Sequence, residues 1–295
     1  MEDEGATRPH WHADEVMARH TSFRIGGPAK IFCEPEGVEE LAEALRHFKE
    51  AGERVYILGA GSNLLVRDEG VAGAVISLRA GAEFRDVRMY GGYVRAGAGA
   101  ALPKVVRMAA QAGLSGMEAL VGIPGTMGGA ARMNAGGRHG NIGPLVQSVL
   151  VMRPDGVSVE RLPRERLVFE YRRSNLVGLI VLETELALTK DRPEAVSEKT
   201  HAIYEEKKKA QPLWEPSAGC VFKNPSEKVS AGMLIDKAGL KGTAVGGAVV
   251  SERHANFIVN RGGATASDVL RLIELIRDRV RKEHNVTLEL EVEVW

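Results

Sequence analysis

The chain has 295 residues, of which 44% are apolar and 26% are charged, and this composition is typical of a folded globular protein and excludes a disordered or fibrous one. A single hydrophobic core rarely grows past about 250 residues, so two or three domains are expected. Lysine plus arginine and aspartate plus glutamate number 39 each, a balance that disfavours a nucleic acid or an anionic membrane as partner.

The first 18 residues show no apolar periodicity and are predicted to form a flexible arm. They lack an apolar core, so we expect no signal peptide, and no apolar run reaches the length of a membrane span. The two cysteines, Cys33 and Cys220, have neither metal-ligand nor redox spacing, so no metal site is predicted. We expect a cytoplasmic protein that functions as a monomer.

The first half of the chain alternates short strands with helices. Apolar periodicity predicts, in order, a strand at 29–33, an amphipathic helix from 38 to about 52, a strand at 55–58, short β runs between 75 and 98, and a helix from about 103 to 112. This last helix has Pro103 near its start and stops at Gly113, as helices commonly do. Two further strands are expected on either side of the turn 154–156.

A polar helix from about 193 to 209 is followed by Pro212 and Pro216, which mark the strongest candidate domain boundary. The pattern beyond them predicts a strand, a helix at 231–238, strands near 248 and 257, a helix at 267–283 and an alternating final strand at 287–295. We therefore predict a first lobe at 19–80, a second lobe at 81–212 and a third domain at 213–295.

Two glycine-rich loops are the most distinctive local features. Gly59-Ala60-Gly61-Ser62-Asn63 follows a strand, but Leu64 replaces the third glycine of a Rossmann loop and no helix follows. Backbone N–H groups in such a loop can still cradle a phosphate, although an ordinary tight turn is the alternative. The second loop, residues 121–137, holds six glycines in 17 positions, a density that indicates close backbone approach to a ligand or a strained turn.

Seven motifs follow one another along the chain. They are HTSFRIGGPA from His20, GAGSNLLV from Gly59, GIPGTMGGAARMNAGG from Gly122, FEYRRS from Phe169, SAGCVFKNP from Ser217, AGMLIDKAGLKG from Ala231 and HANFIVN from His254. These motifs and their order resemble those of the UDP-N-acetylenolpyruvoylglucosamine reductases. The resemblance covers about residues 19–295. It implies an α+β protein, with an FAD-binding fold of the vanillyl-alcohol-oxidase (PCMH) type in two lobes and a C-terminal α+β substrate domain, in the family's shorter subtype.

The implied activity is the NADPH-dependent reduction of UDP-N-acetylglucosamine enolpyruvate to UDP-N-acetylmuramate, a step in the synthesis of peptidoglycan precursor. FAD is the implied cofactor, and NADPH and the UDP-sugar are the implied partners. The resemblance assigns FAD binding to two groups of residues: Ile57, Gly59, Ala60, Gly61, Ser62, Asn63 and Leu64 in the first, and Gly122, Ile123, Gly125, Thr126, Gly128 and Gly129 in the second.

Three positions match the catalytic residues of the family. Arg172 would hold the carboxylate and its enolate form, since its planar guanidinium is permanently charged. Cys220 stands where most relatives carry a proton-donating serine, and a thiol is the stronger acid. Glu291 matches the catalytic glutamate, but strand alternation places Glu289 and Glu293 on the same face, so register alone leaves all three open.

The resemblance assigns substrate binding to Tyr171, Asn224, Lys228 and His254, the last at a position where some relatives have glutamine. Relatives often carry lysine where Ala210 stands, so this contact is either missing or supplied by Lys209. Two other functions stay open: an FAD-dependent oxidase of the same fold, and a nucleotide-sugar-binding regulator without catalysis. The sequence does not decide between NADPH and NADH.

Overall fold

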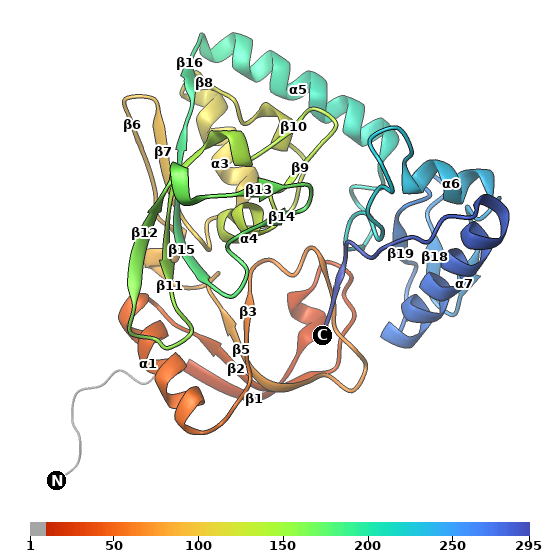
Figure 1. Ribbon diagram of the computed structural model, residues 1–295, viewed down its shortest axis with the longest axis horizontal. Helices are drawn as coiled ribbons and strands as arrows, with labels where there is room; N and C mark the ends of the chain where they lie inside the picture. Colours follow the sequence, from red (N-terminus) through yellow and green to blue (C-terminus); the bar gives the residue numbers. More distant parts are fainter. Residues whose placement is uncertain (1–9) are drawn as a thin grey trace. The chain divides into compact units, whose positions relative to one another are not determined.

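The computed structural model describes residues 10–295, and their contacts define two compact units (Figure 1). Unit 1 contains residues 10–14, 30–60 and 72–204, and unit 2 contains residues 15–29, 61–71 and 205–295. Several elements run from one unit into the other. The division into lobes at 19–80 and 81–212 with a domain at 213–295 stays a prediction.

The predicted flexible arm is wrong over residues 10–18. These residues form strand β1 (His10–Val16) and the start of the 3-10 helix η1 (Met17–His20). Burial explains part of the difference, because Met17 is fully buried. The first nine residues of the predicted arm lie outside the described residues.

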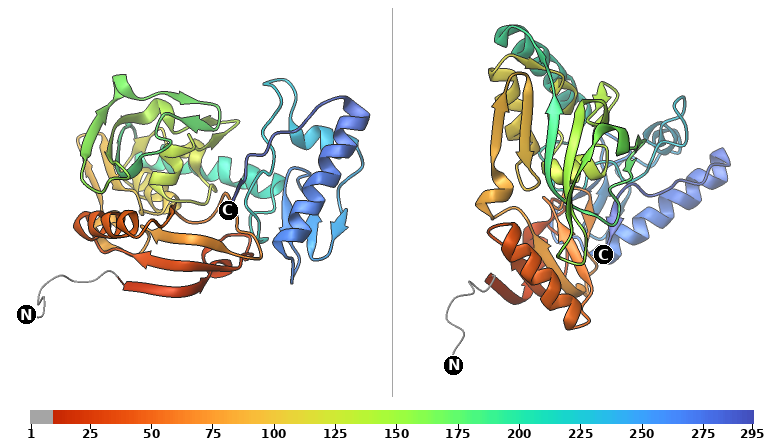
Figure 2. Two further views of the ribbon diagram at one scale, coloured as in Figure 1. Left: turned by 60° about the horizontal axis from the view of Figure 1, so that its bottom comes forward. Right: turned by 60° about the vertical axis from the view of Figure 1, so that its left-hand side comes forward.

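A four-stranded sheet has the order β1-β2-β5-β3, built from β2 (Pro28–Glu34), β5 (Val71–Ser77) and β3 (Val55–Leu58) beside β1. Strands β3 and β5 are parallel. Helix α1 (Val38–Glu50) covers this sheet (Figure 2), because Leu41, Leu45 and Phe48 pack into the same core as Cys33 and Ile76. The predicted strands at 29–33 and 55–58 and the helix from 38 are confirmed.

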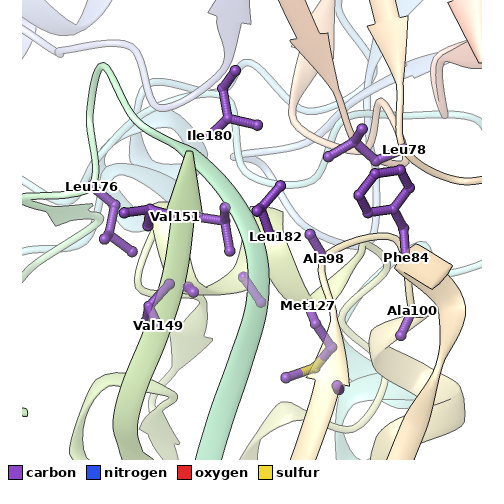
Figure 3. Close-up of a cluster of buried hydrophobic side chains, with 14 of the residues drawn as sticks. Leu78, Phe84, Ala98, Ala100, Met127, Val149, Val151, Leu176, Ile180 and Leu182 are labelled. Atoms are coloured by element: carbon purple, nitrogen blue, oxygen red, sulfur yellow. The ribbon is translucent and has the colours of Figure 1, made fainter. Parts of the chain in front are cut away.

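A five-stranded antiparallel sheet has the order β12-β11-β15-β7-β6. Its strands are β12 (Val159–Pro163), β11 (Val146–Met152), β15 (Ile180–Ala187), β7 (Tyr93–Gly97) and β6 (Val87–Tyr90). Helices α2 (Ala82–Arg85), α3 (Leu102–Gln111) and α4 (Met127–Arg132) contribute to its core, where Phe84, Met127 and Leu182 are buried (Figure 3). The second glycine-rich loop packs on this sheet, because α4 contacts β15 and β7.

Short elements complete the connections of unit 1. They are β8 (Leu114–Ser115) paired with β16 (Thr189–Lys190), β9 (Gly136–Gly137) with β10 (Gly140–Asn141), β13 (Phe169–Glu170) with β14 (Arg173–Ser174), and the 3-10 helices η2 (Glu118–Leu120), η3 (Gly143–Leu145) and η4 (Arg164–Arg166). Helix α5 (Pro193–Ala210) confirms the predicted polar helix and continues into unit 2.

The segment predicted as a single glycine-rich loop contains helix α4. Thr126 caps this helix, and its hydroxyl accepts a hydrogen bond from the Gly129 N–H at 3.4 Å. Glycine is required at 128 for packing, because a methyl group there would lie 2.8 Å from the Cβ of Ala98. Tertiary packing therefore outweighs the low helix propensity of two successive glycines.

Unit 2 is built around helix α7 (Ala266–His284), which contacts strands β17 (Ala244–Val245) and β18 (Ala248–Val250) of a three-stranded sheet. The third strand is β19 (Ile258–Asn260), and helix α6 (Ala231–Lys237) also contacts α7. Strand β4 (Leu64–Leu65) pairs in parallel with β20 (Glu293–Val294). Phe23, Ile25 and Leu65 belong to the same core as α7, so segments distant in sequence share one hydrophobic cluster.

The predicted final strand at 287–295 is wrong for most of its length. Only Glu293–Val294 is a strand, and Leu290 forms an isolated bridge with Phe222. The reason is a change of partner: the Glu291 N–H donates to the Val221 carbonyl, whereas the Glu293 N–H donates to the Asn63 carbonyl. The backbone therefore bends at Val292, between the two pairings.

Among the helices of residues 10–295, none has the length and hydropathy to cross a bilayer.

Candidate active site

The first glycine-rich loop leaves β3 at Gly59 and reaches β4 at Leu64. A methyl group on Gly59 would lie 2.8 Å from the hydroxyl oxygen of Thr126, so the start of this loop directly adjoins the second loop. Gly61 has a φ of +61°, and a methyl group there would lie 2.1 Å from the His20 carbonyl oxygen. Glycine at 61 is therefore required by the packing of the loop against the segment that contains His20.

The two loops fit a dinucleotide cofactor. Gly122 and Gly125 have φ values of +74° and +147°, conformations that direct their peptide groups where other residues rarely can. Among residues 10–295, the backbone N–H groups of Ala60, Gly61 and Gly125 donate to no protein acceptor. Backbone donors such as those of Ala60 and Gly125, both in unit 1, suit a phosphate group, which needs no basic side chain at such a site.

Arg172 lies in the two-residue turn of the hairpin β13–β14 in unit 1. Its φ of +55° is unusual for a residue other than glycine, and such strain persists where the surroundings hold the residue in place. Its Nη1 donates to the Gly136 carbonyl at 2.8 Å, and its guanidinium lies over the ring of Tyr171, 5.2 Å from the centroid. The arginine is thus held in one orientation.

The second glycine-rich loop also supports this hairpin. The side chain of Asn134 donates to the Glu170 carbonyl at 2.8 Å and accepts from the Gly143 N–H at 3.0 Å. The Ser174 hydroxyl donates to the Arg132 carbonyl at 2.7 Å. Asn134 is a residue that sequence reasoning missed. Its φ of +46° is left-handed, a conformation that asparagine adopts more readily than most residues, but this is visible only in the structure.

The structure brings Cys220 and Glu291 onto neighbouring segments of unit 2. Phe222 bridges Leu290, the Glu291 N–H donates to the Val221 carbonyl at 2.8 Å, and the Lys223 N–H donates to the Glu289 carbonyl at 2.9 Å. Cys220 itself bridges Phe257 on its other side. The two residues therefore share one small sheet-like arrangement, whereas Arg172 and Tyr171 belong to unit 1.

The three candidate glutamates have different surroundings. The Glu289 side chain is 78% exposed and forms an ion pair with Lys223. Glu293 lies in β20, beyond the bend at Val292. Glu291 is half-buried, and its carbonyl accepts a hydrogen bond from the Asn63 side chain at 2.9 Å. Glu291 is therefore the glutamate whose backbone contacts both the first loop and the segment that follows Cys220.

Predicted substrate residues gather around the start of helix α6. The Asn224 side-chain oxygen accepts from the Ala231 N–H at 3.1 Å, and Lys228 lies two residues before Ser230, the N-cap. His254 packs beside the same turn, because a methyl group on Gly232 would lie 3.2 Å from its Cε1. Asn224, Lys228 and His254 thus surround one end of one helix.

His254 is held in a defined tautomer. The Asn256 N–H donates to its Nδ1 at 3.2 Å, so the neutral ring carries its proton on Nε2. Burial lowers the pKa of His254 below its ordinary value. A neutral imidazole with an Nε2 proton is a hydrogen-bond donor.

The two cysteines differ in environment. Cys33 is fully buried, and burial raises the pKa of its thiol to about 12. Cys220 is half-buried.

At the end of α5, Lys209 is exposed, whereas Lys207 is only 7% exposed. The replacement of the missing basic contact by Lys209 stays a prediction, and the burial of Lys207 was not foreseen.

Comparison with known proteins gives one consistent result. Residues 211–295 match the model of the UDP-N-acetylenolpyruvoylglucosamine reductase C-terminal domain, and residues 29–160 match that of an FAD binding domain. UDP-N-acetylenolpyruvoylglucosamine reductases of Heliobacterium modesticaldum and Moorella thermoacetica are each 44% identical, over 97% and 96% of this chain and 91% and 92% of their own length.

A solved structure of the corresponding reductase from Thermus caldophilus aligns with a TM-score of 0.84 at 42% identity, covering 98% of this chain and 99% of its own. These matches confirm the resemblance found in the motifs and the FAD-binding α+β fold that it implied. The chain belongs to the family of UDP-N-acetylenolpyruvoylglucosamine reductases.

Proposed function

We propose that this chain reduces UDP-N-acetylglucosamine enolpyruvate to UDP-N-acetylmuramate, with FAD as cofactor and NADPH as hydride donor, in peptidoglycan precursor synthesis. The observation that carries this proposal is the full-length similarity to reductases of that name, combined with the pairing of the segments that contain Cys220 and Glu291. Both substrates are anionic nucleotides, which supports a cytoplasmic location, and we further propose that the protein acts as a monomer without a membrane partner.

FAD would be held by the backbone of the two loops, from Gly59 to Leu64 and from Gly122 to Gly129. Bound there, FAD would supply the hydride relay between NADPH and the terminal carbon of the enol ether. The available N–H groups of Ala60, Gly61 and Gly125 support this placement.

Arg172 would bind the enolpyruvyl carboxylate. Hydride arrival places negative charge on this carboxylate and the adjacent carbon, so a fixed cation stabilises the transition state more than the ground state. The contacts of Arg172 with Gly136 and Tyr171 hold the guanidinium in advance of substrate binding, which avoids a reorganisation cost. Tyr171, which is 54% exposed, would contact the substrate beside it.

Cys220 would complete the reaction as the proton donor. Its S–H proton passes to the carbon adjacent to the carboxylate, a C–H bond forms, and the thiolate then regains a proton from solvent. Glu291, on the segment that pairs with Val221 and Lys223, would polarise the enolpyruvyl carboxylate of the substrate. Asn224, Lys228 and His254 would hold the UDP-sugar, with the Nε2 proton of His254 available for a phosphate oxygen.

The test is a sequence of absorbance measurements on the purified protein. We expect a flavin spectrum at about one FAD per chain, bleaching on anaerobic addition of NADPH, and rapid recovery when the enolpyruvyl substrate is added. An oxidase of the same fold would recover with oxygen and be indifferent to the UDP-sugar. A binding protein without catalysis would retain the reduced flavin, and either result would contradict the proposal.

A further inference from the structure

Residues 220–223, here called the Cys220 strip, are held by hydrogen bonds along both edges. On one edge, Val221 and Lys223 exchange backbone hydrogen bonds with Glu289 and Glu291. On the other, the Val221 N–H donates to the Asn256 carbonyl at 2.8 Å. Phe257 then bridges Cys220, but the main chain before Asn256 turns away from Phe222, because the Phe257 N–H donates to the His254 carbonyl within one turn.

The Asn256 side chain continues the pairing where the backbone leaves it. Its carboxamide oxygen accepts from the Phe222 N–H at 3.0 Å, and its nitrogen donates to the Phe222 carbonyl at 2.8 Å. The carboxamide thus acts as a neighbouring peptide group would in a strand. Asparagine is suited to this role because its side chain carries one donor and one acceptor in the geometry of an amide.

Removing this side chain would leave two buried groups without partners. Asn256 is 3% exposed and Phe222 is 1% exposed, so water does not replace the lost hydrogen bonds without movement of the strip. Phe222 lies two residues from Cys220 and two from Asn224, and it faces Leu290, the neighbour of Glu291. A shift at Phe222 would therefore displace all three proposed functional residues together.

We propose that Asn256 is a positioning residue that fixes the Cys220 strip and thereby aligns the proton donor with Glu291. This inference rests on the proposed function of Cys220. Asn256 acts through the backbone of Phe222 and contacts neither substrate nor cofactor in this role. Misplacement of a reacting group by about 1 Å can cost about 10²-fold in rate, so the effect should appear in the step that uses Cys220.

The first measurement separates the two half-reactions by stopped-flow absorbance. In Asn256→Ala, we expect flavin reduction by saturating NADPH within about threefold of the wild type, and reoxidation by the enolpyruvyl substrate slower by about 10²-fold. The matched control is Asn260→Ala in the same unit, whose side chain donates to the Phe23 carbonyl at 3.0 Å. The control should leave the ratio of the two rates unchanged.

The second measurement does not depend on the reaction. Cys33 is buried, so iodoacetamide should alkylate only Cys220, and Cys220→Ser should abolish the labelling. Loosening the strip in Asn256→Ala should raise the labelling rate of Cys220 by about tenfold or more, because two buried hydrogen bonds no longer oppose local opening. Asn260→Ala should label at the wild-type rate.

Asn256→Asp is a second variant that tests the same role if Asn256→Ala fails to fold. A carboxylate retains the acceptor for the Phe222 N–H but opposes the Phe222 carbonyl, whereas a protonated carboxyl group restores the donor. Reoxidation in this variant should therefore recover as the pH falls, beyond any change in the wild type.

Equal slowing of both half-reactions in Asn256→Ala, or unchanged reoxidation with unchanged labelling, would overturn the positioning role. The same pattern in Asn260→Ala would overturn it as well. Failure of the wild-type enzyme to be reoxidised by the UDP-sugar would instead reject the proposed function, and the labelling comparison would still decide whether Asn256 fixes the strip.

Discussion

At the scale of single residues, Cys220 offers the clearest separation of roles, since hydride transfer from NADPH precedes the step that it would serve. In Cys220→Ala, we expect flavin reduction near the wild-type rate and reoxidation by the enolpyruvyl substrate slower by about 10²–10⁴-fold, the usual contribution of a positioned acid. Cys220→Ser should recover much of this rate, because a serine hydroxyl can donate a proton from the same position. Stopped-flow absorbance measures both steps.

The pH dependence of Cys220 provides a second check on the same residue. A thiol must be protonated to donate, so reoxidation in the wild type should fall as the pH rises through the pKa of the thiol. This decline should be absent from Cys220→Ser. If the alanine variant is reoxidised at the wild-type rate, Cys220 serves only in packing and the proton comes from another group.

His254 links burial to the pH dependence of stability. Because burial lowers its pKa in the folded state, the unfolded chain binds more protons between this lowered value and about 6.5. The free energy of unfolding should therefore fall as the pH drops from about 7 through this window. In His254→Gln, the fall should be smaller than in the wild type, and urea unfolding at several pH values measures the difference.

The matched control is His201→Gln, because His201 is exposed on α5. It should leave the pH dependence of unfolding as in the wild type. An equal reduction of the slope in both variants would mean that the loss of any histidine produces the effect and that the burial of His254 does not.

Residue-scale prediction from the sequence was limited where tertiary contacts decide which residue faces which partner. The alternation of Glu289, Glu291 and Glu293 gave no means of choosing, because the choice depends on a bend created by two pairing partners far apart in the chain. The contribution of Asn256 was equally hidden, since nothing local shows that its side chain pairs with Phe222.

At the scale of elements, helix α7 has an unusually complete N-terminus. Thr265 and Asp268 form a capping box, in which each side chain accepts from the backbone N–H of the other. Asp68, from the segment after the first glycine-rich loop, accepts from the Ala266 and Ser267 N–H groups at 2.7 and 2.9 Å. The helix start therefore ties this segment to the C-terminal part of unit 2.

We expect Asp68→Ala to lower the free energy of unfolding by about 1–3 kcal/mol, since it removes a carboxylate that caps two helix N–H groups. Asp278→Ala on the same helix is the control. Its ion pair with Arg281 is 71% and 66% exposed, so its loss should cost about 0–1 kcal/mol. Chemical denaturation compares the two, and equal effects would mean that the cap contributes nothing beyond a surface charge.

The helices were the best predicted elements because amphipathic periodicity is local, as α1, α3, α6 and α7 show. Helix α4 was missed because the need for glycine at 128 comes from contact with Ala98, which is distant in sequence. The loop glycines are similar. The sequence left open whether the Gly61 loop binds a ligand or forms a tight turn. In the structure the His20 carbonyl excludes a side chain at Gly61, so a substitution there would disturb unit 2 as well as any flavin site.

At the scale of the whole molecule, the sequence placed a C-terminal domain after Pro212 because the prolines mark a boundary in the chain. Unit 2 extends further, since it also includes residues 15–29 and 61–71. Phe23, Ile25 and Leu65 are buried in the core of α7, and β20 finds its only strand partner among the described residues in β4. Contacts between such distant segments leave no periodic trace in the sequence.

This organisation predicts that unit 2 depends on the N-terminal segment for its stability. Phe23 is fully buried in the core that surrounds Leu272 and Ile276, so Phe23→Ala should destabilise unit 2 by about 3–5 kcal/mol. Amide hydrogen exchange along α7 should accelerate in proportion, since those amides exchange through opening of this core. An isolated fragment of residues 205–295 should lack a cooperative unfolding transition, because it lacks all three buried side chains from the earlier segments.

The control is Phe84→Ala, which removes an equally buried ring from the core of unit 1 and should leave exchange in α7 much less affected. Wild-type exchange in α7 of Phe23→Ala, together with a cooperatively folded fragment, would show that the C-terminal segment is self-sufficient and that its contacts with residues 15–29 add little to its stability.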